Sequence, residues 1–463
     1  MVETGLDGLT PELLERYDRP GPRYTSYPTA PHFHELFGEA EYRDRLAAAA
    51  RRPEEPLSLY VHIPFCRERC TYCGCNVVIS PHGGPEVPYL DAVERELELV
   101  AEALGRRRTL CQLHWGGGTP TYLSPAQIRR LFAAIERRFE IAPDAEVAIE
   151  IDPCVTTPEH LETLAELGFN RISMGLQDLD PEVQRAVRRI QPLELTRDQV
   201  ETVRRLGVGS VNIDLIYGLP FQTEERFRDT VRTVIAELAP DRVACFSYAH
   251  VPWIKPHQRR LDEAALPRGW AKFRLFAAAV EEFLAAGYTF VGFDHFARPG
   301  DELAEALGEG RIHRNFMGYT VMPATDQVGI GLTSIGDVAG AYAANAKNLA
   351  AYHRALADGT LPVDRGILRT PEDELRGAVI RRIICTLELP FAWVEDELGV
   401  DPREHFADAL AALEPMAADG LVELDATGLR VTPRGRFFLR NLCMPFDAHL
   451  ETASTRPIYS RTV

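Results

Sequence analysis

The chain has 463 residues, 45% of them hydrophobic, which is enough for a large core or for two to three domains. Nine cysteines are ordinary usage at this length, so a small secreted disulfide scaffold is excluded. The net charge of −17, from 51 basic and 68 acidic residues, argues against a nucleic-acid partner held through phosphate contacts.

The N-terminal part gives little structural signal. Its first residues are acidic and polar and contain no apolar signal region. No uninterrupted apolar run in the chain approaches the ~20 residues that cross a bilayer. We therefore expect a cytoplasmic protein with no membrane partner. Residues 1–50 show little periodicity beyond a short helix near 39–51, and we expect them to form an N-terminal extension.

From about Leu57 short β-rich runs alternate with longer helical patterns. The expected strands are 57–63, 111–115, 146–152, 171–176, 210–218 and 242–249. The expected helices between them include 89–104, 124–139, 158–167 and 224–238. Ser124 and Thr157 are expected N-caps, because each precedes a proline at the first helical position. This alternation predicts right-handed crossovers, a parallel sheet and an α/β fold with a partial (β/α)6-type barrel over 51–364. Ligands of such a sheet gather beyond the carboxyl ends of the strands.

The last part of the chain changes character. After an expected helix at 267–286, helical patterns from residue 365 surround the segment 419–441, which is typical of a β-hairpin wing followed by a helix. We expect residues 365–463 to form a mostly helical, winged-helix-like C-terminal domain.

Four cysteines crowd the loop directly after the first expected strand, in "FCRERCTYCGCN" at 65–76. They are Cys66, Cys70, Cys73 and Cys75, and a disulfide, a zinc site or an iron–sulfur cluster are the alternatives. Composition disfavours the disulfide, and zinc usually takes paired C-x2-C knuckles or Cys/His combinations that lie well apart in the chain. The chain has no second C-x2-C pair, whereas three thiolates suit a cubane iron–sulfur cluster with one iron left open.

The C-x3-C-x2-C spacing after a first barrel strand resembles the signature of the radical S-adenosylmethionine (radical SAM) superfamily. "HWGGGTP" at 114–120, where missing side chains let backbone approach a ligand closely, resembles the glycine motif of the same superfamily. The resemblance implies a 4Fe–4S cluster whose open iron binds S-adenosylmethionine. It also implies that an electron from the cluster cleaves this cofactor to methionine and a 5′-deoxyadenosyl radical.

Further motifs are similar to those of the oxygen-independent coproporphyrinogen III oxidase family. They include "RYTSYPTA" at 23–30, "LHWGGGTPTYL" at 113–123, "NIDLIYGLP" at 212–220 and "RNLCMPFD" at 440–447. The resemblance implies that two propionates of coproporphyrinogen III are oxidatively decarboxylated to vinyl groups, giving protoporphyrinogen IX in haem biosynthesis. The implied partners are the porphyrinogen and an electron donor such as flavodoxin or ferredoxin, and the expected state is a monomer.

The resemblance also implies roles for individual residues. Cys66, Cys70 and Cys73 are the expected cluster ligands, and Cys75 is a required cysteine that is not a ligand. His62, which lies close to Cys66 on the first strand, is a candidate catalytic residue. The implied contacts of S-adenosylmethionine are Tyr60, Tyr72, Gly117, Gly118, Thr119, Glu150, Gln177, Arg189, Asp214, Ala249 and Ile335.

Two molecules of S-adenosylmethionine are expected. Tyr60, Tyr72 and Gly117 are assigned to the first, and Gly118 and Thr119 to the second. The sequence leaves open whether the arginine of the motif "VRRIQ" that faces the cofactor is residue 188 or residue 189.

Two local basic clusters are candidates for binding the carboxylates of the substrate, although a run of charges is more often a solvated face. The clusters are Arg311, His313 and Arg314 in one case and Lys255, Arg259 and Arg260 in the other. Two alternatives remain open: a haem-trafficking relative and a radical enzyme that opens haem. The trafficking relative is expected to lack the cysteine of "CGCN" and the "RYTSYPTA" extension, and this chain has both.

Overall fold

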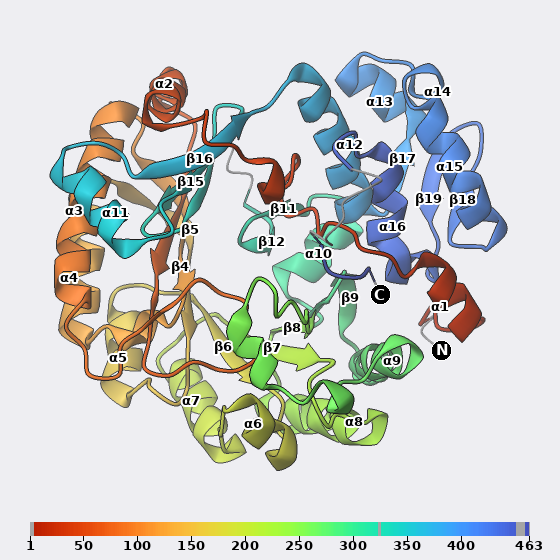
Figure 1. Ribbon diagram of the computed structural model, residues 1–463, viewed down its shortest axis with the longest axis horizontal. Helices are drawn as coiled ribbons and strands as arrows, with labels where there is room; N and C mark the ends of the chain where they lie inside the picture. Colours follow the sequence, from red (N-terminus) through yellow and green to blue (C-terminus); the bar gives the residue numbers. More distant parts are fainter. Residues whose placement is uncertain (1–3, 323–325, 451–458, 463) are drawn as a thin grey trace.

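The computed structural model describes residues 4–322, 326–450 and 459–462. Within these ranges the main feature is a twelve-stranded sheet whose middle part consists of seven parallel strands (Figure 1). Six of them, in spatial order, are β1 (Leu57–Ile63), β4 (Thr109–Gly117), β5 (Glu140–Ile151), β6 (Arg171–Gln177), β7 (Ser210–Tyr217) and β8 (Arg242–Ser247). They confirm the six strands expected from the sequence and the α/β partial barrel.

Helices occupy the crossovers between the parallel strands and line the outer side of the sheet in Figure 1. They are α3 (Glu86–Leu104), α4 (Pro125–Glu136), α5 (Pro158–Glu166), α6 (Pro181–Val187), α7 (Leu193–Arg205) and α8 (Glu224–Thr233). The pair α6 and α7 was not predicted, and it fills the crossover between β6 and β7. No helix in the described part of the chain is long and apolar enough to cross a membrane.

The expected helix starts are confirmed by their capping contacts. The Ser124 hydroxyl accepts a hydrogen bond from the Gln127 amide, and the Thr157 hydroxyl accepts one from the His160 amide. In both helices a proline occupies the first turn, where its missing N–H leaves no helical hydrogen bond unmade. Local chemistry therefore fixes where α4 and α5 begin.

Additional strands widen the sheet at both edges. β13 (Asp326–Ile330) runs parallel to β1, and β14 (Ile335–Val338), β15 (Ala341–Asn345) and β16 (Val363–Leu368) follow in antiparallel order. At the other edge β10 (His295–Ala297) and β9 (Thr289–Gly292) add antiparallel pairs next to β8. These strands could not be separated from the sequence alone, because they are short and β9, β13, β14 and β16 contain glycine.

The N-terminal residues contact both the large sheet and the C-terminal end of the described chain. They contain α1 (Pro11–Tyr17) and the expected helix α2 (Glu39–Ala49). In Figure 1 the segment between these helices runs from the sheet to the C-terminal helices. It pairs with the last described residues at Pro20 and Arg461 and with β16 at His34 and Gly366.

The C-terminal part is mostly helical, as expected. α12 (Pro371–Thr386) leads into a three-stranded sheet in which β19 (Gly428–Val431) lies between β17 (Glu388–Pro390) and β18 (Val422–Leu424) within the described residues. The hairpin of β18 and β19 corresponds to the expected wing. The predicted boundary at residue 364 falls inside β16, and the division into domains stays a prediction.

Candidate active site

A cavity of about 770 Å³ opens at the carboxyl ends of the parallel strands. Most of the predicted site residues lie together in its wall, although they come from six different parts of the chain. Those that line it are Cys66, Cys70, Tyr72, Cys73, Cys75, Gly117, Gly118, Thr119, Glu150, Gln177, Arg189, Asp214 and Ala249. Tyr60, His62 and Ile335 are not among the lining residues.

The cysteine loop leaves β1 and is held by short-range pairing and by α6. Its first part, β2 (Phe65–Cys66), pairs with β3 (Val78–Ile79), which closes the loop on itself. The Thr71 amide donates to the Val187 carbonyl of α6 at 3.1 Å. The Cys66 Sγ lies 3.4 Å from the Thr119 hydroxyl. The loop is therefore fixed at both ends and in its middle, with its thiols toward the cavity.

The donor set of this loop fits an iron–sulfur cluster. All four thiols are free, and soft thiolates are the ligands that such clusters take. Within the described residues no group of three or more His, Cys, Asp or Glu side chains converges on the position of a single ion. Thiolates of a cubane each bind a different iron, and the thiols of this loop that line one cavity fit such a cluster.

The ionisation of the thiols differs along the loop. Burial raises the pKa of Cys66 to about 11 and also raises that of Cys70, which the nearby Arg189 guanidinium partly offsets. A hydrogen bond from Cys75 lowers the pKa of Cys73, and the same bond holds the pKa of Cys75 well above its usual value. Cys75 is therefore the thiol that keeps its proton in this pair.

The three glycines that end β4 let main chain pack where a side chain would not fit. A Cβ at Gly116 would lie 2.8 Å from the Glu150 carboxylate, and one at Gly118 would lie 2.7 Å from the backbone that begins the cysteine loop. A Cβ at Gly117 would lie 2.5 Å from the His62 ring, and the φ of this glycine is +112°. The motif thus brings β4, β5 and the cysteine loop together at the cavity wall.

His62 lies behind this wall rather than in the cavity. Its Nδ1 is 3.1 Å from the Tyr60 hydroxyl, and its Nε2 is 3.3 Å from the Asn76 carbonyl of the cysteine loop. Burial lowers its pKa, so the ring is neutral near pH 7. This placement, against Gly117 and the loop, supports a positioning role for His62. Ile335 packs away from the cavity, against a cluster that contains Phe33.

Two carboxylates face the cavity from the strand ends. Glu150 of β5 accepts a hydrogen bond from the Gly117 amide at 3.1 Å and lies 3.4 Å from His114 Nε2. Burial opposes its ionisation, but these contacts hold its pKa below the usual value. Asp214 of β7 accepts a 2.7 Å hydrogen bond from the Asn212 amide group. Burial, aided by the charge of Glu150, raises the pKa of Asp214 to about 7.

Arg188 and Arg189 both line the cavity, and the Arg189 guanidinium is the more deeply buried of the two. It donates to both oxygens of Asp152 at 3.1 and 3.0 Å and to the Gly175 carbonyl at 2.8 Å. Its Nη1 lies 4.0 Å from the Cys70 Sγ. Arg188 caps α6 in a left-handed conformation and is exposed. These contacts favour residue 189 of the two neighbouring arginines, and its role toward the cofactor stays a prediction.

The sequence analysis missed how the loop after β8 supports the cysteine loop. Lys255 Nζ, His257 Nε2 and Gln258 Nε2 contact carbonyl oxygens of residues 72–75 at 3.2, 2.8 and 3.0 Å. From the sequence, residues 255–260 could be recognised only as the site of a basic cluster, because a hydrogen bond to a main-chain carbonyl depends on the fold and not on the type of residue that carries the carbonyl. Arg259 and Arg260 of the same cluster are exposed.

The chain matches two family models. The model described as the radical SAM superfamily matches residues 60–234, and that of the HemN C-terminal domain matches residues 369–438. An oxygen-independent coproporphyrinogen III oxidase of Pseudomonas aeruginosa is 45% identical over 454 residues, 98% of each chain. The protein of the same name from Escherichia coli K12 is 44% identical and covers 97% of this chain and 98% of its own.

A solved structure is similar over most of the chain as well. It is described as "Coproporphyrinogen III oxidase (HemN) from Escherichia coli is a Radical SAM enzyme", and it is 44% identical. It superposes with a TM-score of 0.88 and covers 92% of this chain and 98% of its own length. Sequence and fold therefore agree over nearly the whole molecule.

Proposed function

The chain belongs to the oxygen-independent coproporphyrinogen III oxidase family of the radical SAM superfamily, and from this membership we propose how its residues perform the family reaction. The reaction is the anaerobic oxidative decarboxylation of two propionates of coproporphyrinogen III to vinyl groups, which yields protoporphyrinogen IX in haem biosynthesis. The observation that carries the assignment of roles is that the cysteine loop, the glycine turn and the acidic strand ends line one cavity.

The 4Fe–4S cluster and S-adenosylmethionine together supply a 5′-deoxyadenosyl radical that removes a hydrogen from the propionate β-carbon. The role of the protein is to hold them and to exclude competing reactions. Cys66, Cys70 and Cys73 would hold the cluster, each through one iron. Cys75 lines the same cavity, and we assign it no iron.

S-adenosylmethionine binds along the strand ends. Gly117 offers main chain without a side chain to the first molecule, and Glu150 and Asp214 lie where polar groups of the cofactor can be held. Gly118 and Thr119 are assigned to a second molecule in the same cavity. We propose contacts with S-adenosylmethionine only for residues that line the cavity. Tyr60 and Ile335 do not line it, so we assign them to the packing around it.

The cavity residues also orient the cofactor and keep water away from the radical. Arg189 carries a positive charge beside Cys70, which favours the thiolate form of that ligand. Lys255, His257 and Gln258 hold the carbonyl groups of the cysteine loop, so they fix the place of the cluster relative to β8. Such fixed groups contribute to catalysis by holding the reacting atoms in place.

Reduction of the cluster requires a partner. The expected donor is a flavodoxin or a ferredoxin, and Arg67 and Arg69 at the rim of the cavity support an acidic partner of this kind. We propose that the protein acts as a cytoplasmic monomer, which sedimentation of the anaerobic protein tests directly.

The function is tested with anaerobically reconstituted protein, S-adenosylmethionine, a reductant and coproporphyrinogen III. The expected product is protoporphyrinogen IX with two methionines and two carbon dioxides, one of each for every propionate. Cofactor cleavage without decarboxylation and with tight haem binding supports the trafficking alternative, and consumption of haem supports the ring-opening alternative. Either outcome would contradict the assignment.

A further inference from the structure

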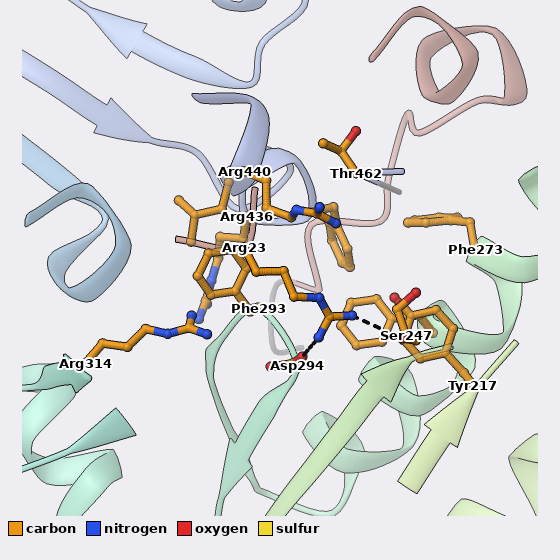
Figure 2. Close-up of a pocket in the computed structure, with 13 residues that line it drawn as sticks. Arg23, Tyr217, Ser247, Phe273, Phe293, Asp294, Arg314, Arg436, Arg440 and Thr462 are labelled. Atoms are coloured by element: carbon orange, nitrogen blue, oxygen red, sulfur yellow. Dashed lines mark hydrogen bonds and ion pairs between the residues drawn. The ribbon is translucent and has the colours of Figure 1, made fainter. Parts of the chain in front are cut away.

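A second cavity next to the active site is lined by four arginines (Figure 2). It lies where the N-terminal segment, the ends of β7 and β8, and α16 (Leu439–Cys443) meet. The arginines are Arg23, Arg314, Arg436 and Arg440, and among the residues that line the cavity Asp294 is their one carboxylate. Four positive charges against one negative charge is a notable excess in a chain with a net charge of −17.

Among the described residues Arg314 has no carboxylate within ion-pair distance, and its charge acts only at longer range on Asp294, where it helps to lower the pKa. Its guanidinium carbon lies 4.5 Å from the centre of the Phe293 ring and 5.1 Å from that of Tyr319. Its Nε and Nη1 atoms are buried, and neither has a hydrogen-bond partner in the described chain. A buried charged donor without a partner is unfavourable, so a ligand that accepts these hydrogen bonds would remove a penalty.

Arg436 and Arg440 donate to main-chain carbonyl groups and form no ion pair with any described carboxylate. Arg436 donates to the Phe290 carbonyl, and its Nε is buried without a partner. Arg440 donates to the carbonyls of Pro22 at 3.0 Å and Arg461 at 2.7 Å, which ties both chain termini to the cavity wall. Burial lowers the pKa of Arg436 to about 10 and that of Arg440 to about 9. These positive charges are therefore costly to bury without an anion.

The second cavity adjoins the active site through shared wall residues. Arg23 and Ser247 line both cavities, and the Arg23 guanidinium donates to the Ser247 carbonyl at 3.1 Å. Figure 2 shows this guanidinium between Ser247 and Asp294, with which it forms an ion pair of 3.6 Å. None of the described cysteines lines the second cavity. A group bound in the second cavity would therefore lie beside the active-site cavity and apart from the cysteine loop.

The size of the second cavity sets the kind of group that it accepts. Its volume is about 60 Å³. A site needs about 10–15 Å³ on this measure to hold one water molecule, so the cavity holds a few atoms rather than a pyrrole ring. Guanidinium groups bind carboxylates with matched geometry and pairs of hydrogen bonds. Size and charge together point to a carboxylate on a short chain.

Building on the proposed function, we propose that this arginine pocket binds a propionate carboxylate of the tetrapyrrole that is not being decarboxylated. Arg314 and Arg436 hold the carboxylate, Arg23 lies at the boundary with the reacting part of the substrate, and Arg440 positions the segment that carries Arg23. A carboxylate that leaves as carbon dioxide loses its charge, so strong ion pairs to it stabilise the ground state and raise the barrier. Such pairs suit a propionate that is retained.

The test compares binding of coproporphyrin III, the oxidised and fluorescent form of the substrate, with binding of its tetramethyl ester. Wild-type holoprotein is expected to bind the free acid more tightly than the ester. Arg314→Met is expected to weaken binding of the free acid roughly 10- to 100-fold and to leave binding of the ester unchanged. Its KM for coproporphyrinogen III is expected to rise by a similar factor. Arg430→Met, on the exposed wing, is the matched control and is expected to behave as the wild type.

Equal affinity of Arg314→Met and wild type for the free acid overturns the pocket assignment. If Arg314→Met loses iron or unfolds at a lower temperature, the comparison of free acid and ester in the wild type decides. Equal affinity of the wild type for the two ligands also overturns the pocket assignment. Wild-type turnover separates the two proposals. If the wild type prefers the free acid but does not convert coproporphyrinogen III, the proposed function fails and the pocket stands.

Discussion

Replacing Gly117 with alanine tests how the glycine turn builds the active site. The added Cβ would lie 2.5 to 2.7 Å from three atoms of the His62 ring, which is buried between Tyr60 and the cysteine loop. The φ of +112° adds backbone strain of roughly 1–3 kcal/mol, and overpacking against a fixed ring costs roughly another 1–3 kcal/mol. We expect the free energy of unfolding to fall by roughly 2–6 kcal/mol.

Gly84 provides a matched control because it has nearly the same φ without the contact. Its φ is +116°, and a Cβ there would meet no heavy atom within 4 Å. Gly84→Ala should therefore show the strain alone, and Gly117→Ala should cost roughly 1–3 kcal/mol more. Urea titration of both variants measures the difference, and affinity for S-adenosylmethionine should fall only in Gly117→Ala. Equal destabilisation and equal cofactor affinity in the two variants would refute the packing argument.

Two further predictions concern the thiols and Asp214. Cys70→Ala should lose the charge-transfer absorbance and most of the about four irons of a cubane. Cys75→Ser should keep the iron and lose turnover, and loss of iron from this variant would contradict the assignment. Burial raises the pKa of Asp214 from 3.8 to about 7. Between these two pH values the folded state holds a proton that the unfolded state has released, so the stability that Asp214 contributes is lost as the pH rises through 7. Urea midpoints of the cluster-free protein at pH 5 and 8 should therefore differ less in Asp214→Asn than in wild type, and an identical pH dependence would show that Asp214 ionises normally.

The barrel and the cysteine loop could be predicted because their signals are local. Strands such as β1 and helix starts such as Ser124 follow from patterns within about ten residues. The strands β13 to β16 could not, since they are short and join the sheet through the pairing of β13 with β1, which is far away in sequence. Periodicity does not report such pairing.

The same limit applies to the site. Cys66, Cys70 and Cys73 lie within one loop, so their spacing alone predicts shared chemistry. The type of residue at position 62 could not show that this histidine packs behind the cavity, because its contact with Gly117 is known only from the fold. The arginine pocket was partly hidden for a related reason: Arg314 belonged to a visible basic cluster, but the other three arginines come from distant segments that only the fold brings together.

The central claim is that this cavity directs a radical to the propionate β-carbon of coproporphyrinogen III. It is tested most directly with substrate deuterated at these positions, under anaerobic single-turnover conditions with the reconstituted protein. The account predicts deuterium in the 5′-deoxyadenosine and one vinyl group for each cofactor cleaved. Cleavage of S-adenosylmethionine with no deuterium in 5′-deoxyadenosine and no vinyl product would contradict it.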